Sequence, residues 1–151
     1  MLPAWARRDP AKYVKRIRWE KECLGKYFPS FEMMQEDDGD IFLEGNIVTL
    51  NENVYKVKVY FPDNYPYSPP IPVVMDIDVI AHCKKFDIHE YHYYEDKSID
   101  GLRICVIKPD DTIGTGWKPD FSSISVILLA SAWLHAFEVK KETGIWPLPE
   151  A

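Results

Sequence analysis

The spacing of apolar residues along the chain changes twice, and it begins with a helical period. Between residues 10 and 24 the apolar positions recur every three or four residues, which predicts an amphipathic helix. These positions are Tyr13, Val14, Ile17 and Leu24. Asp9 is a typical N-cap and Pro10 suits the first helical position. We therefore predict a helix from about Pro10 to Leu24, before the break at Pro29.

A period of two follows, over the stretches "FEMMQE", "DIFLEGNIVTL", "VYKVKVYF" and "IPVVMDIDVI". Alternation of this kind predicts four successive strands in an antiparallel meander. In the third stretch one side carries Tyr55, Val57, Val59 and Phe61, and the other side carries Lys56, Lys58 and Tyr60. We predict a tight turn at Asn51-Glu52-Asn53, between the second and third strands, with an asparagine in the left-handed conformation.

The second half of the chain returns to a helical period only near its end. Residues 81–101 show no clear period, which predicts a long, partly ordered loop, and "GLRICVI" after them is a short apolar run. The stretch "SISVILLASAWLHAFEVKKETG" predicts a long helix that is capped by Ser122 or Ser123 and stops at Gly144. Its predicted core positions are Ile124, Ile127, Leu128, Ala132 and Leu134.

The order of these elements predicts an α+β fold in one domain, residues 1–151. Apolar residues make up 46% of the chain and charged residues 28%, which is the composition of a soluble globular protein. A net charge of −6 argues against general binding to nucleic acid or to anionic membranes.

Two further features of the sequence indicate the cellular compartment of the protein. The N-terminal "MLPAWARRDP" lacks the apolar core of a signal peptide, and we find no stretch of about 18 apolar residues that would span a membrane. Cys23, Cys83 and Cys105 are an odd number of cysteines at unrelated spacings, which suits a reducing compartment. We therefore expect a cytoplasmic protein.

The stretch "NYPYSPP", residues 64–70, predicts a rigid corner after the third strand. Pro69 and Pro70 cannot donate ladder hydrogen bonds, and Tyr65 supplies flat apolar area with a polar tip. Read with its neighbours as "YKVKVYFPDNYPYSPPIPVV", it resembles the third strand, the Tyr-Pro-x-x-Pro-Pro corner and the fourth strand of ubiquitin-conjugating enzymes. In this resemblance Tyr65, Pro66, Pro69 and Pro70 form the corner.

The resemblance continues in "GLRICVI" and "GWKPDFSSISVILL". Cys105 matches the reactive thiol of these enzymes, Trp117 and Pro119 match a Trp-x-Pro motif, and a helix follows in both. The likeness, from about Pro10 to His135, implies a UBC-like fold in which Cys105 is the nucleophile that carries an acyl group as a thioester, without a cofactor. It also separates the chain from the related RWD modules, which space the corner prolines differently and have no reactive cysteine.

The His-Pro-Asn triplet of the family, whose asparagine stabilises the oxyanion, is absent. The corresponding region reads "IHEYHYYEDKSIDGLRIC", and His92 and Tyr94 are our candidate donors for the oxyanion near Cys105. The alternative, that the histidine is structural and the tyrosine a packing residue, stays open. Asp110 and Asp111 beyond the cysteine either orient an attacking lysine or belong to a solvated loop.

Two further differences from the family pattern indicate which of its members this chain resembles. The segment between Pro70 and Cys105 is longer than in most of the family, and one long helix follows where eukaryotic members add two more. This minimal form, with a His-x-Tyr pattern, resembles the bacterial conjugating enzymes of anti-phage operons called CBASS. That likeness implies a partner that offers its C-terminus, either a cGAS-like nucleotidyltransferase or a ubiquitin-like protein, and leaves the need for an activating enzyme open.

Alternative interpretations remain for several residues. A histidine and cysteine cluster can bind zinc, although the spacings here match no ligand pattern; its members would be His82, Cys83, His89 and His92. His135 and Glu138, one helical turn apart, would form a ligand pair or a surface contact. Finally, the same fold with an inert Cys105 would serve as a binding module.

Overall fold

The protein, seen in a computed structural model, is described over residues 1–108 and 116–149. Its helical elements are a 3₁₀ turn at Ala4–Ala6, α1 at Pro10–Tyr27, α2 at Ile77–Cys83, α3 at Ile88–Tyr91 and α4 at Ser123–Thr143. Its strands are β1 at Glu32–Gln35, β2 at Ile41–Val48, β3 at Val54–Tyr60, β4 at Ile71–Val74, β5 at Tyr93–Tyr94 and β6 at Leu102–Ile104.

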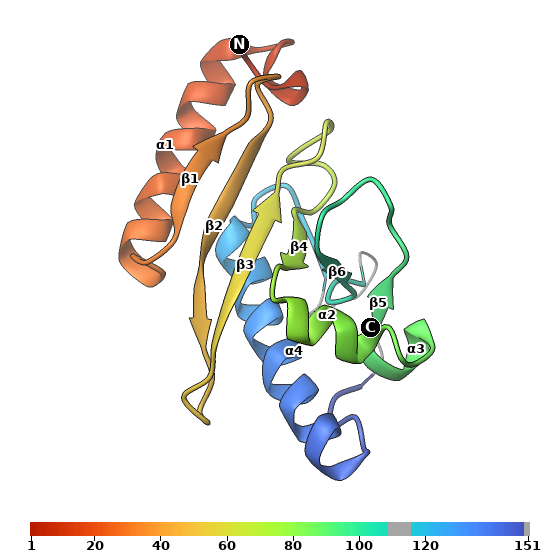
Figure 1. Cartoon of the computed structure of the whole chain (residues 1–151). Coiled ribbons are helices and arrows are strands. Elements are labelled where there is room, and N and C mark those ends of the chain that lie inside the picture. Colours follow the sequence, from red (N-terminus) through yellow and green to blue (C-terminus); the bar gives the residue numbers. More distant parts are fainter. Residues whose placement is uncertain (109–115, 150–151) are drawn as a thin grey trace.

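The strands form one antiparallel sheet in the order β1-β2-β3-β4-β6-β5. In Figure 1, α4 crosses behind the middle of this sheet and α1 lies beside β1. The core lies between α4 and the sheet, where Leu43 of β2, Val57 of β3 and Ile127 of α4 are fully buried. Apolar burial on this scale is the main favourable contribution to the stability of the fold.

The predicted α+β, UBC-like architecture is confirmed, and β1 to β4 form the predicted meander. The N-terminal helix also begins as predicted, because the Asp9 carboxylate accepts a hydrogen bond from the Lys12 N–H at 3.2 Å. Two predicted apolar positions are wrong. Val14 and Leu128 are 52% and 56% exposed, because each lies on the solvent side of its helix.

The predicted fourth strand is correct only in its first half, since β4 ends at Val74 and residues Ile77–Cys83 form α2. The ladder stops because the Asp76 carboxylate accepts the Lys56 N–H at 2.8 Å, where a further strand residue would have paired. Val79 and Cys83, four residues apart, then bury one side of α2. The helical spacing was present in the sequence, but it was hidden within a continuous apolar run.

Residues 81–101, predicted as a loop, contain the end of α2, the single turn of α3 and the short strand β5. α3 begins where the Asp87 carboxylate accepts the His89 N–H at 3.0 Å. β5 pairs with β6, and β6 in turn pairs with β4. The antiparallel sheet therefore extends beyond the predicted meander by two strands, which no local pattern indicated.

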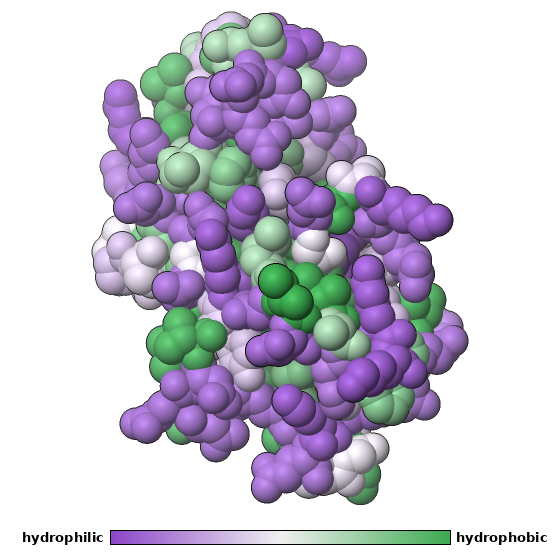
Figure 2. Space-filling model, in the orientation of Figure 1, coloured by the Kyte–Doolittle hydropathy of each residue, from purple (hydrophilic) through white to green (hydrophobic). Residues whose placement is uncertain are grey.

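α4 is capped by Ser122, whose hydroxyl accepts the Ile124 N–H at 3.2 Å, and ends at Gly144 with φ 80°. By length and composition alone this helix could cross a membrane, contrary to our expectation from the sequence. However, 56% of its most apolar window is buried within the protein, as in the core helix of a soluble domain. The face shown in Figure 2 carries only small apolar patches between hydrophilic side chains.

The turn between β2 and β3 is held by α4. Glu52, and not an asparagine as predicted, adopts the left-handed conformation, with φ 65°. Asn51 and Asn53 donate their side-chain N–H groups to the Glu138 carboxylate, and the Leu50 N–H donates to Nε2 of His135. His135 and Glu138 are therefore contacts that fasten this hairpin, in agreement with the second of the two interpretations.

Glu138→Gln is expected to make the free energy of unfolding depend less on pH in the acidic range. Burial acts to raise the pKa of the Glu138 carboxyl, but hydrogen bonds from Tyr55, Asn53, Thr49 and Asn51 outweigh it and lower the pKa. A lowered pKa contributes stability above the unfolded value, about 4.3, that is lost as pH falls through the folded value.

The measurement is urea unfolding of wild type and Glu138→Gln at about pH 6 and about pH 3. We expect the gap in the free energy of unfolding between the two proteins to shrink at the lower pH. Glu142→Gln, on the exposed end of α4, is the control. A gap of constant size at both pH values contradicts the prediction.

Candidate active site around Cys105

Cys105 directly follows β6 at the end of the sheet. Its N–H donates to the carbonyl of His92 at 2.8 Å, which continues the pairing of β5 with β6 by one residue. Gly101, just before β6, has φ 100°, and a Cβ there would lie 2.6 Å from Cγ1 of Val73. Only glycine lets β6 approach β4 this closely, and this approach fixes where the cysteine emerges.

The alternation of β5 and β6 sends the thiol outward. Tyr93, Leu102 and Ile104 point into the core and are at most 3% exposed. Tyr94 pairs with Arg103 across the two strands, so both share the outer side with Cys105. Tyr94 is 46% exposed and Cys105 is half-buried. Cys105 therefore lies on the outer side of the sheet and is partly exposed.

The polar surroundings of the thiol come from Tyr94 and Arg103. Burial raises the pKa of the Cys105 thiol, while a hydrogen bond from Tyr94 and the charge of Arg103 act to lower it. Burial is the main cause that raises the pKa of the Tyr94 hydroxyl, and the nearby Cys105 raises it further. Because a raised pKa keeps this hydroxyl protonated at neutral pH, Tyr94 remains a hydrogen-bond donor beside the sulfur.

Arg103 contacts the ring of Tyr94 across the two paired strands. Its guanidinium carbon lies 4.7 Å from the centre of the Tyr94 ring, within cation–π range. It also forms an ion pair with Asp96 at 3.2 Å. Arg103 was not among the residues predicted from the sequence, although its place two residues before Cys105 puts it on the same side of the strand.

A small groove of about 120 Å³ runs beside this site. Residues 69–72, which include Pro69 and Pro70, form one wall, and Tyr94, Arg103 and Ile107 contribute to the other. The corner prolines thus line the approach to the region of the thiol. An extended chain end with small side chains fits a groove of this size better than a bulky ligand does.

The other predicted corner residues lie together behind the groove. Tyr65 is 1% exposed and stacks on Phe61 at 4.3 Å between ring centres. The Tyr65–Pro66 peptide bond is cis. The indole N–H of Trp117 donates to the Pro66 carbonyl at 2.7 Å, and the Pro119 carbonyl accepts from Arg16. The structure therefore brings the Trp-x-Pro segment onto the corner.

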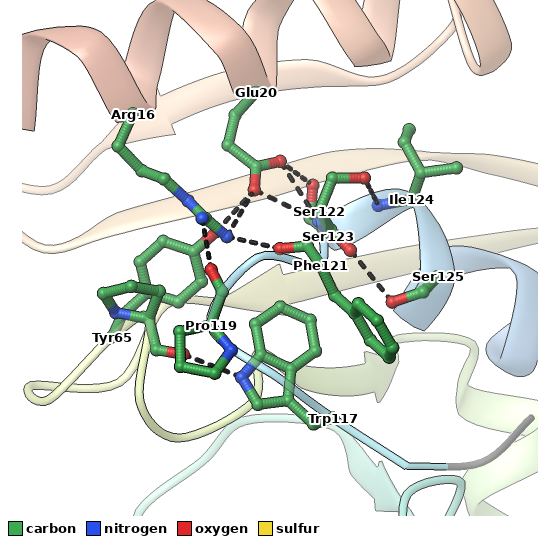
Figure 3. Close-up of polar contacts among 11 residues, drawn as sticks. Arg16, Glu20, Tyr65, Trp117, Pro119, Phe121, Ser122, Ser123, Ile124 and Ser125 are labelled. Carbon is green, nitrogen blue, oxygen red and sulfur yellow. Dashed lines mark hydrogen bonds and ion pairs between the residues drawn. The ribbon is translucent and has the colours of Figure 1, made fainter. Parts of the chain in front are cut away.

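A buried carboxylate joins this corner to both long helices (Figure 3). Glu20 of α1, fully buried, accepts hydrogen bonds from the Tyr65 hydroxyl and from the N–H and hydroxyl of Ser123. Arg16, one turn earlier, pairs with Glu20 at 3.4 Å and donates to the Tyr65 hydroxyl. Because buried carboxylates are rare unless fully paired, this network fixes α1, the corner and the start of α4 relative to one another.

The second predicted donor, His92, has a different position. It caps α3 in the left-handed conformation, with φ 53°, and its ring lies 4.8 Å from that of Trp146. Its backbone carbonyl accepts the N–H of Cys105 at 2.8 Å. The Tyr94 side chain, on the outer side of β5, acts to lower the pKa of the Cys105 thiol.

The proposed zinc ligands serve other contacts. Nε2 of His82 is hydrogen-bonded to the Tyr91 hydroxyl at 2.8 Å, and Cys83 is fully buried in the core, where burial raises its pKa to about 12. His89 is exposed in the turn of α3. Asp110 and Asp111, the candidate residues for orienting a lysine, lie outside the described residues.

The N-terminal helix, the antiparallel sheet and the long α4 together form an α+β fold of the UBC-like kind. Residues 20–151 match the family model of the Type II CBASS E2 protein, and the chain belongs to this family. Membership supports a role in CBASS anti-phage systems and a conjugating, E2-like role together with other CBASS components. No curated protein matches the chain.

Proposed function

We propose that the protein is a thioester carrier in which Cys105 accepts the C-terminus of a partner protein and passes it on. The observation that carries this proposal is the place of Cys105, which is partly exposed on the outer side of the sheet, beside Tyr94 and Arg103 and next to a narrow groove. Thiols suit a carrier because the thiolate is a strong nucleophile and also a fair leaving group.

In the loading step the Cys105 thiolate attacks the carbonyl carbon of a partner's C-terminal acyl group, held as a thioester on an activating enzyme. A C–S bond to Cys105 forms as the C–S bond to the donor breaks. The donor sulfur leaves as a thiolate and takes up the proton that Cys105 has lost. In the second step an acceptor amine attacks the same carbonyl carbon, a C–N bond forms as the C–S bond to Cys105 breaks, and the Cys105 thiolate takes up the proton that the nitrogen loses.

Negative charge develops on the carbonyl oxygen in both steps. Tyr94 lies beside Cys105 on the outer side of β5 and β6 and acts to lower the pKa of the thiol, so we place its hydroxyl within reach of an oxygen on the carbon bonded to that sulfur. Donors aimed at this oxygen lower the barrier to acyl transfer. We assign this role to Tyr94, with His92 supporting it through its backbone.

The partner that fits the family context is a cGAS-like nucleotidyltransferase, with a ubiquitin-like protein as the second candidate. Either would offer a flexible C-terminus that enters the groove between the corner prolines and Tyr94. The reaction would take place in the bacterial cytoplasm as part of anti-phage defence.

Incubation with the nucleotidyltransferase and its activating partner tests this directly. Wild type is expected to form a covalent adduct that excess thiol cleaves, whereas Cys105→Ser forms an oxygen ester that resists thiol. Cys23→Ser, which changes a half-buried thiol on α1, is the matched control and should behave as wild type. A thiol-sensitive adduct with Cys105→Ser rules the proposal out.

One observation favours a second function, a binding module with an inert cysteine. Burial raises the pKa of Cys105, so little of the thiol is ionised at neutral pH. In that case the protein would bind the nucleotidyltransferase without a covalent adduct, and Cys105→Ser would bind it as well as wild type does.

A further inference from the structure

The segment after α4 returns to the active-site side of the protein. Gly144, with φ 80°, ends the helix, and the ring of Trp146 then lies 4.8 Å from His92, 5.9 Å from Trp133 and 6.2 Å from Tyr91. Trp146 is half-buried although it lies outside every helix and strand. The tail is therefore fastened over the junction between α3 and β5.

Trp133 holds the same junction from inside. It is 1% exposed, and its indole N–H donates to the carbonyl of Tyr91 at 3.0 Å and to that of His92 at 3.1 Å. The His92 carbonyl thus accepts from Trp133 and also from the N–H of Cys105 at 2.8 Å. One backbone oxygen connects the core of α4 to the nucleophile.

His92 needs such support because of its backbone. The left-handed conformation is unfavourable for a non-glycine residue and persists where neighbouring contacts enforce it. This bend turns the chain from α3 into β5 and so sets the register that places Tyr94 opposite Arg103. The register in turn determines whether the Tyr94 hydroxyl reaches Cys105.

We infer that Trp146 and Trp133 are positioning residues, which clamp His92 in its left-handed conformation and thereby hold Tyr94 in place beside Cys105. The inference rests on the proposed function, because it names what positions the donor of that same site. It assigns a role to the tail segment that neither the fold nor the family membership gives it.

The test follows the reaction of Cys105 with a small aromatic disulfide over about pH 6 to 10, with the modified cysteine identified by peptide mass. Among residues 1–108 and 116–149, the charged and titratable groups near the thiol are Tyr94, Arg103, His92 and, through Arg103, Asp96. Loss of the Tyr94 hydrogen bond removes a contribution that lowers the pKa of Cys105, so the midpoint of the pH profile moves up. If the midpoint rises by about one pH unit, the reaction at neutral pH slows about threefold. The effect is smaller than tenfold because the more basic thiolate is a better nucleophile.

Trp146→Ala and the milder Trp146→Leu are both expected to raise this midpoint, in the same direction as Tyr94→Phe. Trp146→Phe keeps an aromatic ring over His92 and should restore the wild-type profile. The double variant Trp146→Ala/Tyr94→Phe should show no further shift beyond Tyr94→Phe, because both changes remove the same hydrogen bond.

Two results overturn the inference. One is a lower melting temperature for Trp146→Ala and Trp146→Leu with an unchanged midpoint, which would make Trp146 a purely structural contact. The other is a double variant whose shift is the sum of the two single shifts. Since the reagent needs no partner protein, failure of the thioester function leaves this result standing, and the two proposals fail separately.

Discussion

Glu20→Ala is expected to lower the free energy of unfolding by about 3 to 5 kcal/mol, the range for removing one partner of a buried ion pair. The carboxylate is fully buried and accepts from the Tyr65 hydroxyl and from the N–H and hydroxyl of Ser123. Alanine leaves the buried N–H and hydroxyl of Ser123 without this acceptor and removes the carboxylate that pairs with Arg16. Urea unfolding gives the measurement.

Two matched variants make this result specific. Glu22→Ala removes an exposed carboxylate from the same helix and should change stability by no more than about 0.5 kcal/mol. Glu20→Gln keeps an oxygen acceptor and should fall between the two. If Glu20→Ala and Glu22→Ala unfold at the same urea concentration, the network in Figure 3 does not stabilise the fold as described.

Tyr94→Phe is expected to slow transfer from Cys105 to an acceptor amine by about 100-fold, the usual cost of losing one oxyanion donor. The substitution keeps the ring under Arg103 and removes only the hydroxyl that is hydrogen-bonded to the thiol. Stability should change little, because the side chain is 46% exposed. The measurement is the single-turnover rate of the loaded protein.

The control for Tyr94 is Tyr67→Phe, which removes a hydroxyl from a tyrosine of the corner that is 75% exposed. It should transfer at the wild-type rate. Equal rates for Tyr94→Phe and Tyr67→Phe would remove Tyr94 from the chemistry and leave the oxyanion without an assigned donor.

Local patterns predicted the elements whose contacts are close in sequence. The N-cap at Asp9, the alternation of β3 and the glycine end of α4 each depend on a few neighbouring residues. α2 was missed because its apolar residues continue the apolar run of β4, and the end of that strand depends on the long-range contact of Asp76 with Lys56. β5 is too short for a period to show, and it forms because β6 offers it a partner.

The residues of the site also divide into those that local motifs predict and those that depend on contacts between distant parts of the chain. Cys105 and the corner residues carry motifs, so the family resemblance could place them. Glu20 and Ser123 are separated by 103 residues in the chain, and no local pattern reveals such a pair. The left-handed turn at His92 is another feature that the sequence did not predict, because composition does not indicate this conformation for a histidine. Trp146 was visible only as part of a short tail.

The most direct measurement is the location of the bond in the wild-type adduct with the nucleotidyltransferase. The adduct is digested at mildly acidic pH, and its cross-linked peptides are fragmented in a mass spectrometer. We expect the C-terminal peptide of the partner to be joined to the sulfur of Cys105 and to be released by hydroxylamine. A partner peptide joined to Cys23, to Cys83 or directly to a lysine, with Cys105 unmodified throughout the reaction, would contradict the account.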